Sequence, residues 1–344
     1  MIKIQNVYYM LAYAFQILNE ENYAKIAFED FEFAEDLLAA ILAKGISIQI
    51  KRGLGREYIA QTEVLTSPYG KIDISASIKQ QTMLRKQLVC AFDDFSENTY
   101  INQVLKATVM LLLRSDDVQM EQKKALKKVM LYFHSVDSIN TFDIQWQRIR
   151  YHRNNATCKM LINICYLVVE GLLPTTQDGS RRMKQFKDNH LHRLYEKFVR
   201  EYYRKHYPDI SVSAAKIDWN VDDGVTELLP AMKSDITLEC QGKTMIIDTK
   251  YYGHTLQSNP LFNSHTIHSG NMYQIFTYIK NRDKDQCGNV SGTLLYAKTD
   301  EEITPDNRYL MGGNRISVKT LDLDKDFSGI RKQLDKLIGE WMQQ

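Results

Sequence analysis

The sequence predicts a two-part protein: an α+β N-terminal domain of helices and a small antiparallel sheet at residues 1–175, and an α/β domain with a mixed sheet at residues 176–344. Hydrophobic spacing in the first part changes from helical to alternating and back to helical. In the second part the order is helix, three strands, helix and strand, which is typical of a mixed sheet covered by helices. Between them lies PTTQDGSRR, residues 174–182, whose Pro, Gly, Ser and charge indicate a linker.

The N-terminal domain is expected to begin with helices. Residues 6–18 carry apolar side chains at helical spacing, and a second helix is expected over 33–44. Residues 46–78 then alternate and contain glycine and proline turn signals, which predicts a small antiparallel sheet or partial barrel. From 97 to about 172 the pattern is helical again.

The second domain opens with a strongly amphipathic helix, whose apolar residues recur at i, i+3, i+4 and i+7 from Leu191 to Tyr202. Residues 181–205 hold nine Lys and Arg against three acids, which fits either a solvated basic face or a surface that meets phosphates. Strands are expected near 210–218, 235–240, 244–251, 291–297 and 315–321, and helices near 271–282 and 327–342.

Amino-acid composition indicates a globular protein and not a membrane or disulfide-rich one. A chain of 344 residues with 44% hydrophobic and 25% charged residues has the content of a soluble globular protein. Its net charge of +2 permits a nucleic-acid partner without requiring one. The five cysteines form no C-x-x-C pair, which indicates reduced thiols. No apolar run reaches the roughly 18 residues of a membrane span and no signal peptide is evident, so we expect a cytoplasmic protein without a membrane partner.

The stretch SDITLECQGKTMIIDTKYYG, residues 234–253, raises two interpretations. Gly242-Lys243-Thr244 looks like the end of a phosphate-binding loop, but that motif requires a glycine where Thr237 stands and a helix after the lysine. The residues that follow are β-branched and strand-like. We therefore expect this chain to hydrolyse no nucleotide itself.

The second interpretation is a β-hairpin with Gln241-Gly242 as a two-residue loop. Paired positions then sum to 483, which places Asp235 opposite Asp248, and Lys250 shares a face with Asp248. Like charges opposite each other destabilise a sheet unless a cation lies between them. Carboxylate oxygens suit a hard cation such as Mg²⁺. The alternative is an exposed hairpin with an ordinary salt bridge.

Asp235 and Asp248-Thr249-Lys250 resemble the PD-(D/E)-x-K nuclease motif, with Ser234 in place of the proline. Gln274 and Tyr278 add a Q-x-x-x-Y pair one helical turn apart, an element that follows the catalytic hairpin in one large branch of these nucleases.

The likeness extends over nearly the whole chain. NVYYMLAYAF, KRGLGREY, FSENTYINQVLKATVMLLL, LYEKFVREYYRKH, LLPAMKSDITL, IIDTKYY and HSGNMYQIFTYI together resemble the McrC family, the nuclease subunits of the McrBC modified-cytosine restriction systems. This resemblance implies a restriction-endonuclease-like domain at 176–344 and Mg²⁺-dependent cleavage of double-stranded DNA that contains modified cytosine. It also implies that the N-terminal domain docks on, and stimulates, a hexameric AAA+ GTPase of the McrB type, which binds GTP and recognises the modified base, in a bacterial or archaeal cytoplasm.

The resemblance implies roles for the motif residues. Asp235 and Asp248 would hold the metal, with the backbone carbonyl of Thr249 as a further ligand. Lys250 would orient the attacking water and stabilise the developing negative charge. A metal in this position lowers the pKa of its bound water.

Supporting residues are expected from the neighbouring helices. Gln274 and Tyr278 would support the site, and His268 is expected to approach DNA. Many such nucleases add an acid from a helix; Glu201 lies nearer the edge of the apolar stripe than Glu196 and is favoured, although a solvated glutamate remains an alternative for each.

Other classes remain open at this point. One alternative is a non-catalytic GTPase-activating adaptor with a structural nuclease fold, against which the intact Asp235, Asp248 and Lys250 set argues. Another is a free-standing nuclease of repair or transposition, against which the N-terminal resemblance argues. His265 and His268 suggest zinc, but neither Cys nor a third His stands at ligand spacing.

Overall fold

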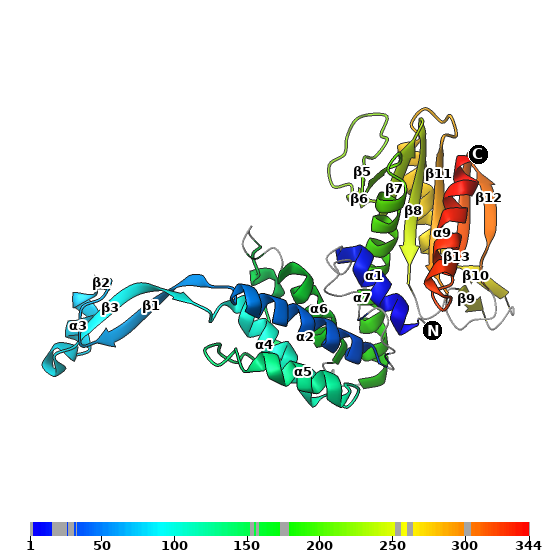
Figure 1. Ribbon diagram of the computed structural model, residues 1–344. Helices are drawn as coiled ribbons and strands as arrows, with labels where there is room; N and C mark the ends of the chain where they lie inside the picture. The colour runs from blue at the N-terminus through cyan, green and yellow to red at the C-terminus, as the bar shows by residue number, and fades with distance from the viewer. Residues whose placement is uncertain are drawn as a thin grey trace. The chain divides into compact units, whose positions relative to one another are not determined.

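The structure, a computed structural model, describes residues 3–15, 26, 31, 33–151, 155, 158–172, 179–251, 256–259, 264–298 and 304–343. The chain divides into two compact units: unit 1 combines Met1–Glu32 with Pro174–Gln344, and unit 2 is Phe33–Leu173 (Figure 1). Unit 2 is therefore an insertion in unit 1. No helix in the described ranges is long and apolar enough to cross a bilayer.

Unit 2 has a helical body. Its helices are α2 (Ala34–Arg52), α4 (Tyr100–Arg114), α5 (Met120–Met130) and α6 (Cys158–Leu172). α2 packs on α5 and α6, and α4 packs on α5 and α6, around side chains such as Leu37, Ile41 and Val104 that are fully buried. The prediction of strand over residues 46–52 is wrong, because α2 continues to Arg52 with Ile46 buried one turn after Leu42. Alternation over so few residues does not distinguish a strand from a buried helical turn.

A long arm extends from this body. β1 (Glu57–Leu65) and β3 (Leu88–Ser96) pair antiparallel along nine positions, and β2 (Lys71–Ile72) adds to β3. α3 (Ile74–Lys79) and a short 3-10 helix, η3 (Thr82–Arg85), lie at the far end of the ribbon (Figure 1). The predicted small antiparallel sheet is thus confirmed, as an open ribbon of three strands, although its central strand β3 lies beyond the expected range of 46–78. Exposed apolar side chains gather along it: Tyr58, Val64, Tyr69, Ile72, Ile74, Ile78, Met83, Leu84 and Phe95.

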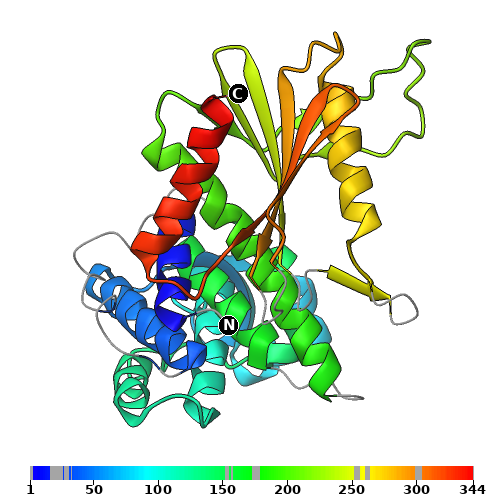
Figure 2. The same cartoon turned by 90° about the vertical axis from the view of Figure 1, so that its right-hand side faces the viewer.

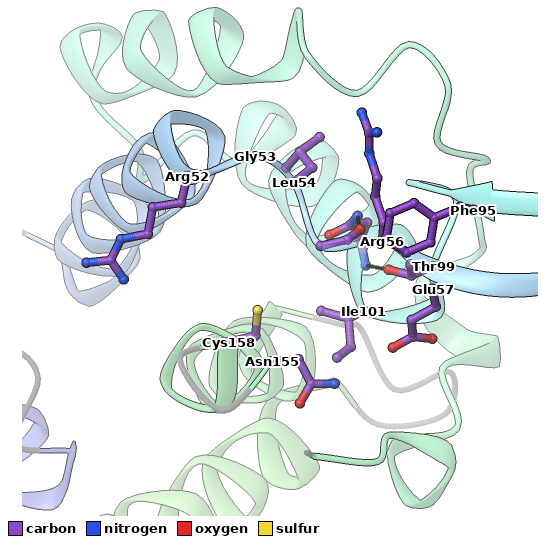
Figure 3. A pocket seen from close by; sticks show the side chains of 12 residues that line it. Arg52, Gly53, Leu54, Arg56, Glu57, Phe95, Thr99, Ile101, Asn155 and Cys158 are labelled. Atoms are coloured by element: carbon purple, nitrogen blue, oxygen red, sulfur yellow. Dashed lines mark hydrogen bonds between the residues drawn. The ribbon is translucent and has the colours of Figure 1, made fainter. Parts of the chain in front are cut away.

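The base of the arm is held by a buried amide. The Asn102 Nδ2 donates to the Gly55 carbonyl at 2.9 Å and to the Glu97 carbonyl at 2.8 Å, so one side chain joins the chain entering β1 to the chain leaving β3. Arg56 pairs with the Glu97 carboxylate at 2.7 Å. A cavity of about 410 Å³ opens beside them, with Cys158 on its lining (Figure 3).

Unit 1 is built on a mixed six-stranded sheet of order β12-β13-β11-β8-β7-β4. Its strands are β4 (Ser211–Ser213), β7 (Ile236–Cys240), β8 (Lys243–Lys250), β11 (Val290–Ala297), β12 (Asn307–Met311) and β13 (Asn314–Leu321). β8, β11 and β13 run parallel, and the other pairs are antiparallel, which confirms the predicted mixed sheet.

Helices cover both faces of this sheet (Figure 2). α8 (Ser269–Arg282) packs on one face, and α7 (Gly179–His206) and α9 (Phe327–Met342) pack on the other. Two ribbons of two strands complete the unit: β5 (Lys216–Ile217) with β6 (Met232–Lys233), and β9 (Leu256–Asn259) with β10 (Ser264–Ile267).

The first helix, α1 (Ile4–Phe15), belongs to unit 1, which differs from the expected division at residue 175. The Asn6 Nδ2 donates to the carbonyls of Leu323 and Lys325 at 2.7 and 2.8 Å. The Tyr9 ring stacks on Phe327 with centroids 4.3 Å apart. α1 also packs along α7, so its apolar face is buried by residues far away in the sequence.

Candidate active site

The hairpin of β7 and β8 has the predicted register. All five pairs of β7 and β8 residues sum to 483. Gln241 and Gly242 have φ of 49° and 78°, the left-handed conformations that a tight two-residue hairpin turn requires. Asp235 directly precedes β7, and the same register carried one step further sets it opposite Asp248 on β8. The sequence therefore places both acids at one end of the hairpin.

The Asp235 carboxylate is fixed by the neighbouring strand. Its Oδ2 accepts hydrogen bonds from the Thr249 backbone N–H and from the Thr249 hydroxyl, both at 2.8 Å. The Thr249 carbonyl lies 2.7 Å from the Nε2 of His192 on α7. The role of His192 has no signal in the sequence, because a histidine 57 residues before its partner leaves no local pattern.

Asp248 and Lys250 form a buried pair. Asp248 is 1% exposed and Lys250 is 8% exposed, and the lysine Nζ lies 2.7 Å from the Asp248 Oδ2. Burial raises the pKa of Asp248 to about 6; Lys250 opposes this rise and the charge of Asp235 adds to it. One lysine therefore does not offset the burial of this carboxylate beside a second acid.

The Q-x-x-x-Y pair reaches the same lysine. Lys250 Nζ donates to the Gln274 Oε1 at 3.1 Å, and the Gln274 Nε2 donates to the Tyr278 hydroxyl at 3.0 Å. Gln274 and Tyr278 are four residues apart on α8, so they lie on one face of the helix. A continuous line of contacts thus joins Asp248, Lys250, Gln274 and Tyr278.

The helix acid beside the site is Glu196. Burial and then the charge of Asp235 raise the pKa of Glu196, while Arg200, 2.9 Å from its Oε1, acts in the opposite direction. Glu201, the acid favoured from the sequence, pairs with Arg204 at 2.5 Å and lies 3.9 Å from the Arg200 Nε. Distance from the apolar stripe of a helix does not indicate which edge of that stripe meets the hairpin.

The two histidines of the following segment do not combine into a site. His265 is exposed on β10, and His268 directly precedes α8. Across the described residues no group of three or more His, Cys, Asp or Glu side chains is arranged to hold a metal ion.

The donor set at the hairpin fits a hard cation. It comprises the carboxylates of Asp235 and Asp248 and the carbonyl oxygen of Thr249, and oxygen donors of this kind suit Mg²⁺. Glu196 lies close enough to Asp235 for their charges to interact but is not part of this donor set. The cavity at the base of the arm lies in unit 2 and has no comparable set of carboxylates and lysine in its lining.

Comparisons with known proteins identify the family of the chain. The model of the family described as McrBC 5-methylcytosine restriction system component matches residues 3–297. The chain is 26% identical over 349 residues to the type IV methyl-directed restriction enzyme EcoKMcrBC of Escherichia coli (strain K12), covering 99% of this chain and 98% of that protein.

Among solved structures, the chain resembles one from a half-complex of the tetradecameric assembly of Thermococcus gammatolerans McrB AAA+ hexamers with bound McrC. The TM-score is 0.53 at 14% identity, covering 98% of this chain and 75% of that chain. At this identity the likeness shows the shared fold.

Proposed function

The chain belongs to the family of McrBC 5-methylcytosine restriction system components, and we propose that it is the subunit that cuts DNA, a Mg²⁺-dependent endodeoxyribonuclease of the PD-(D/E)-x-K type. The observation that carries the proposal is the meeting of Asp235, Asp248, Lys250 and Gln274 at one end of the β7–β8 hairpin. Two acids that can hold a divalent cation, a lysine, and an amide that positions the lysine suit metal-dependent hydrolysis of a phosphodiester.

Each residue has a defined task in this proposal. Asp235, Asp248 and the Thr249 carbonyl would hold the divalent cation, which when bound lowers the pKa of a water and neutralises the scissile phosphate. Lys250 stabilises the negative charge that develops on the phosphate and orients the attacking water. Gln274 limits where the Lys250 ammonium can lie, and Tyr278 fixes Gln274 in turn.

Unit 2 is proposed to dock on a McrB-type AAA+ GTPase hexamer. Its arm carries exposed apolar side chains from Tyr58 to Phe95, which is the surface expected of a partner-binding element. The chain has no complete phosphate-binding loop, so GTP is assigned to the partner, as is recognition of the modified cytosine in double-stranded DNA. We place this activity in the cytoplasm.

The test uses the full chain with its GTPase partner and methylated duplex DNA. Asp235→Asn and Asp248→Asn should each lower cleavage by more than about 100-fold, because each removes a charged ligand, while GTPase stimulation stays near the wild-type rate. Lys250→Ala should also abolish cleavage but keep Mn²⁺ binding, measured by calorimetry. Full cleavage by Asp248→Asn, in a protein with a native circular dichroism spectrum, would contradict the assignment.

A further inference from the structure

Arg200 on α7 connects the helix acid to the start of the catalytic hairpin. Its Nη1 lies 2.9 Å from the Glu196 Oε1 and donates to the backbone carbonyl of Asp235 at 3.4 Å. The side chain is 19% exposed, so the guanidinium is largely withdrawn from water. One group therefore contacts Glu196, Glu201 through its Nε at 3.9 Å, and the main chain of a proposed metal-binding residue.

The contacts of Arg200 complement those of Thr249. Thr249 fixes the Asp235 carboxylate through two hydrogen bonds from β8, while Arg200 holds the Asp235 backbone from α7. Asp235 directly precedes β7, outside the strand ladder, so these contacts from two elements define its position.

Arg204 provides an internal comparison on the same helix. It pairs with Glu201 at 2.5 Å and donates to the Val212 carbonyl at 3.1 Å. Arg204 thus makes the same kind of bridge from an α7 acid to a strand carbonyl, but it contacts neither Glu196 nor Asp235 in the described structure, and it is 49% exposed. The two arginines share Glu201, since the Arg200 Nε lies 3.9 Å from the Glu201 Oε1, so an effect found in Arg200 variants and not in Arg204 variants reflects the contacts with Glu196 and Asp235.

We propose that Arg200 is a positioning residue that serves as an internal counter-ion: it holds Glu196 beside Asp235 and steadies the Asp235 main chain in the metal-free protein. This inference rests on the proposed nuclease function. The guanidinium contacts Glu196 and the Asp235 main chain beside the proposed metal site, so its positive charge opposes a divalent cation there while it keeps these groups in place. Arg200 weakens metal binding and improves the geometry for cleavage.

The proposal predicts opposite changes in metal affinity and cleavage. Arg200→Gln should bind Mn²⁺ about threefold to tenfold more tightly, because one positive charge is removed from a largely buried site. The same variant should cleave methylated DNA about tenfold more slowly at saturating metal. Arg200→Lys, which keeps the charge, should bind Mn²⁺ as the wild type does and recover part of the cleavage rate. Arg204→Gln should leave both quantities within twofold of wild type.

The experiment measures Mn²⁺ affinity by calorimetry on the full chain and cleavage with the GTPase partner present. Unchanged or weaker Mn²⁺ binding by Arg200→Gln, or equal effects in Arg204→Gln, would overturn the counter-ion role. If wild-type protein neither binds Mn²⁺ nor cleaves DNA with its partner, the nuclease function itself fails. A thermal melt of each metal-free variant shows whether the protein is folded, and Arg200→Lys provides the test if Arg200→Gln is not.

Discussion

Two glutamates on α7, five residues apart, have different surroundings. Glu196 interacts with Asp235 and shares Arg200 with the Asp235 carbonyl, whereas Glu201 is held by Arg204 beside Val212 and lies 3.9 Å from the Arg200 Nε. The difference follows from helix geometry, since five residues turn the side chain by about 140°. In the proposed site, Glu196 is the α7 acid that interacts with the hairpin.

We therefore expect Glu196→Gln to lower DNA cleavage at least about tenfold, because it removes a negative charge beside the proposed metal site. Glu201→Gln should cleave within about twofold of wild type. The measurement is the single-turnover cleavage rate with the GTPase partner, at equal protein stability. Equal losses in the two variants would contradict this assignment.

Asp283 is a buried acid remote from the chemistry. It is 3% exposed, and its carboxylate accepts hydrogen bonds from the Asn314 side chain at 2.6 Å and from the Gly288 and Cys287 backbone N–H groups at 3.0 and 3.1 Å. Burial alone would raise the pKa of Asp283, but these hydrogen bonds outweigh burial and lower it. The ionised form therefore ties the loop after α8 to β13.

A lowered folded-state pKa stabilises the protein above the unfolded pKa, near 4, and this stabilisation is lost as pH falls through the folded value. Asp283→Asn should thus lower the free energy of unfolding at pH 7 by about 1–3 kcal/mol. The deficit relative to wild type should shrink below about pH 4. Urea unfolding at several pH values measures this, and a deficit that stays constant with pH would refute the role of the charge.

The helix that carries Gln274 depends on a glycine in the sheet. A Cβ at Gly292 on β11 would lie 2.8 Å from the Ile275 Cγ1 and still closer to the Ile279 Cδ1. Both isoleucines are fully buried, so α8 has no room to move without losing contacts. The close approach of α8 to β11 sets the height of Gln274 over Lys250.

Gly292→Ala should therefore destabilise the protein by about 1–3 kcal/mol through overpacking. Cleavage should fall as well, because α8 must shift and Gln274 shifts with it. Gly339→Ala on α9, where a Cβ meets nothing within 4 Å, is the control and should be neutral or slightly stabilising. A Gly292→Ala protein with wild-type stability and cleavage would contradict this, because it would show that α8 can shift away from β11 without cost.

The spacing of residues in the sequence predicted those elements whose structure depends on neighbouring residues. The β7–β8 register follows from alternation on either side of Gln241-Gly242, and the α8 face that carries Gln274 and Tyr278 follows from helical spacing. Hydrophobic spacing gave the wrong element where a short segment fits both the helical and the strand period. Residues 46–52 are an example, because they were expected as strand and are helical. Spacing in the sequence also does not predict the contact between His192 and Thr249, since that contact depends on how α7 crosses the sheet.

At the scale of the whole molecule, the insertion of unit 2 decides which fragments are self-contained. α1 buries Met10 and Leu11 inside unit 1, at 1% and 0% exposure. A fragment that ends at residue 172 would carry α1 without the helices that cover it. The sequence alone predicted a division near 175 because nothing in residues 4–15 indicates a partner more than 300 residues away.

We expect residues 33–173 to fold alone and to stimulate the partner GTPase without cleaving DNA, because this unit has its own core. Residues 1–172 should aggregate more readily, since the apolar face of α1 is exposed. Light scattering and GTPase assays on the two fragments measure this. A soluble, active fragment 1–172 beside an unfolded fragment 33–173 would place α1 with unit 2.

The bonds from Asn6 to Leu323 and Lys325 also set an order of events during synthesis. α1 precedes unit 2 in the chain, yet the unit 1 residues that Asn6 contacts follow unit 2, whereas unit 2 is contiguous and can fold as soon as it has emerged. A nascent or prematurely terminated chain can therefore display a folded arm before the residues of the proposed nuclease site have been made. Translation itself thus delays assembly of the proposed DNA-cutting centre until after unit 2 has been synthesised.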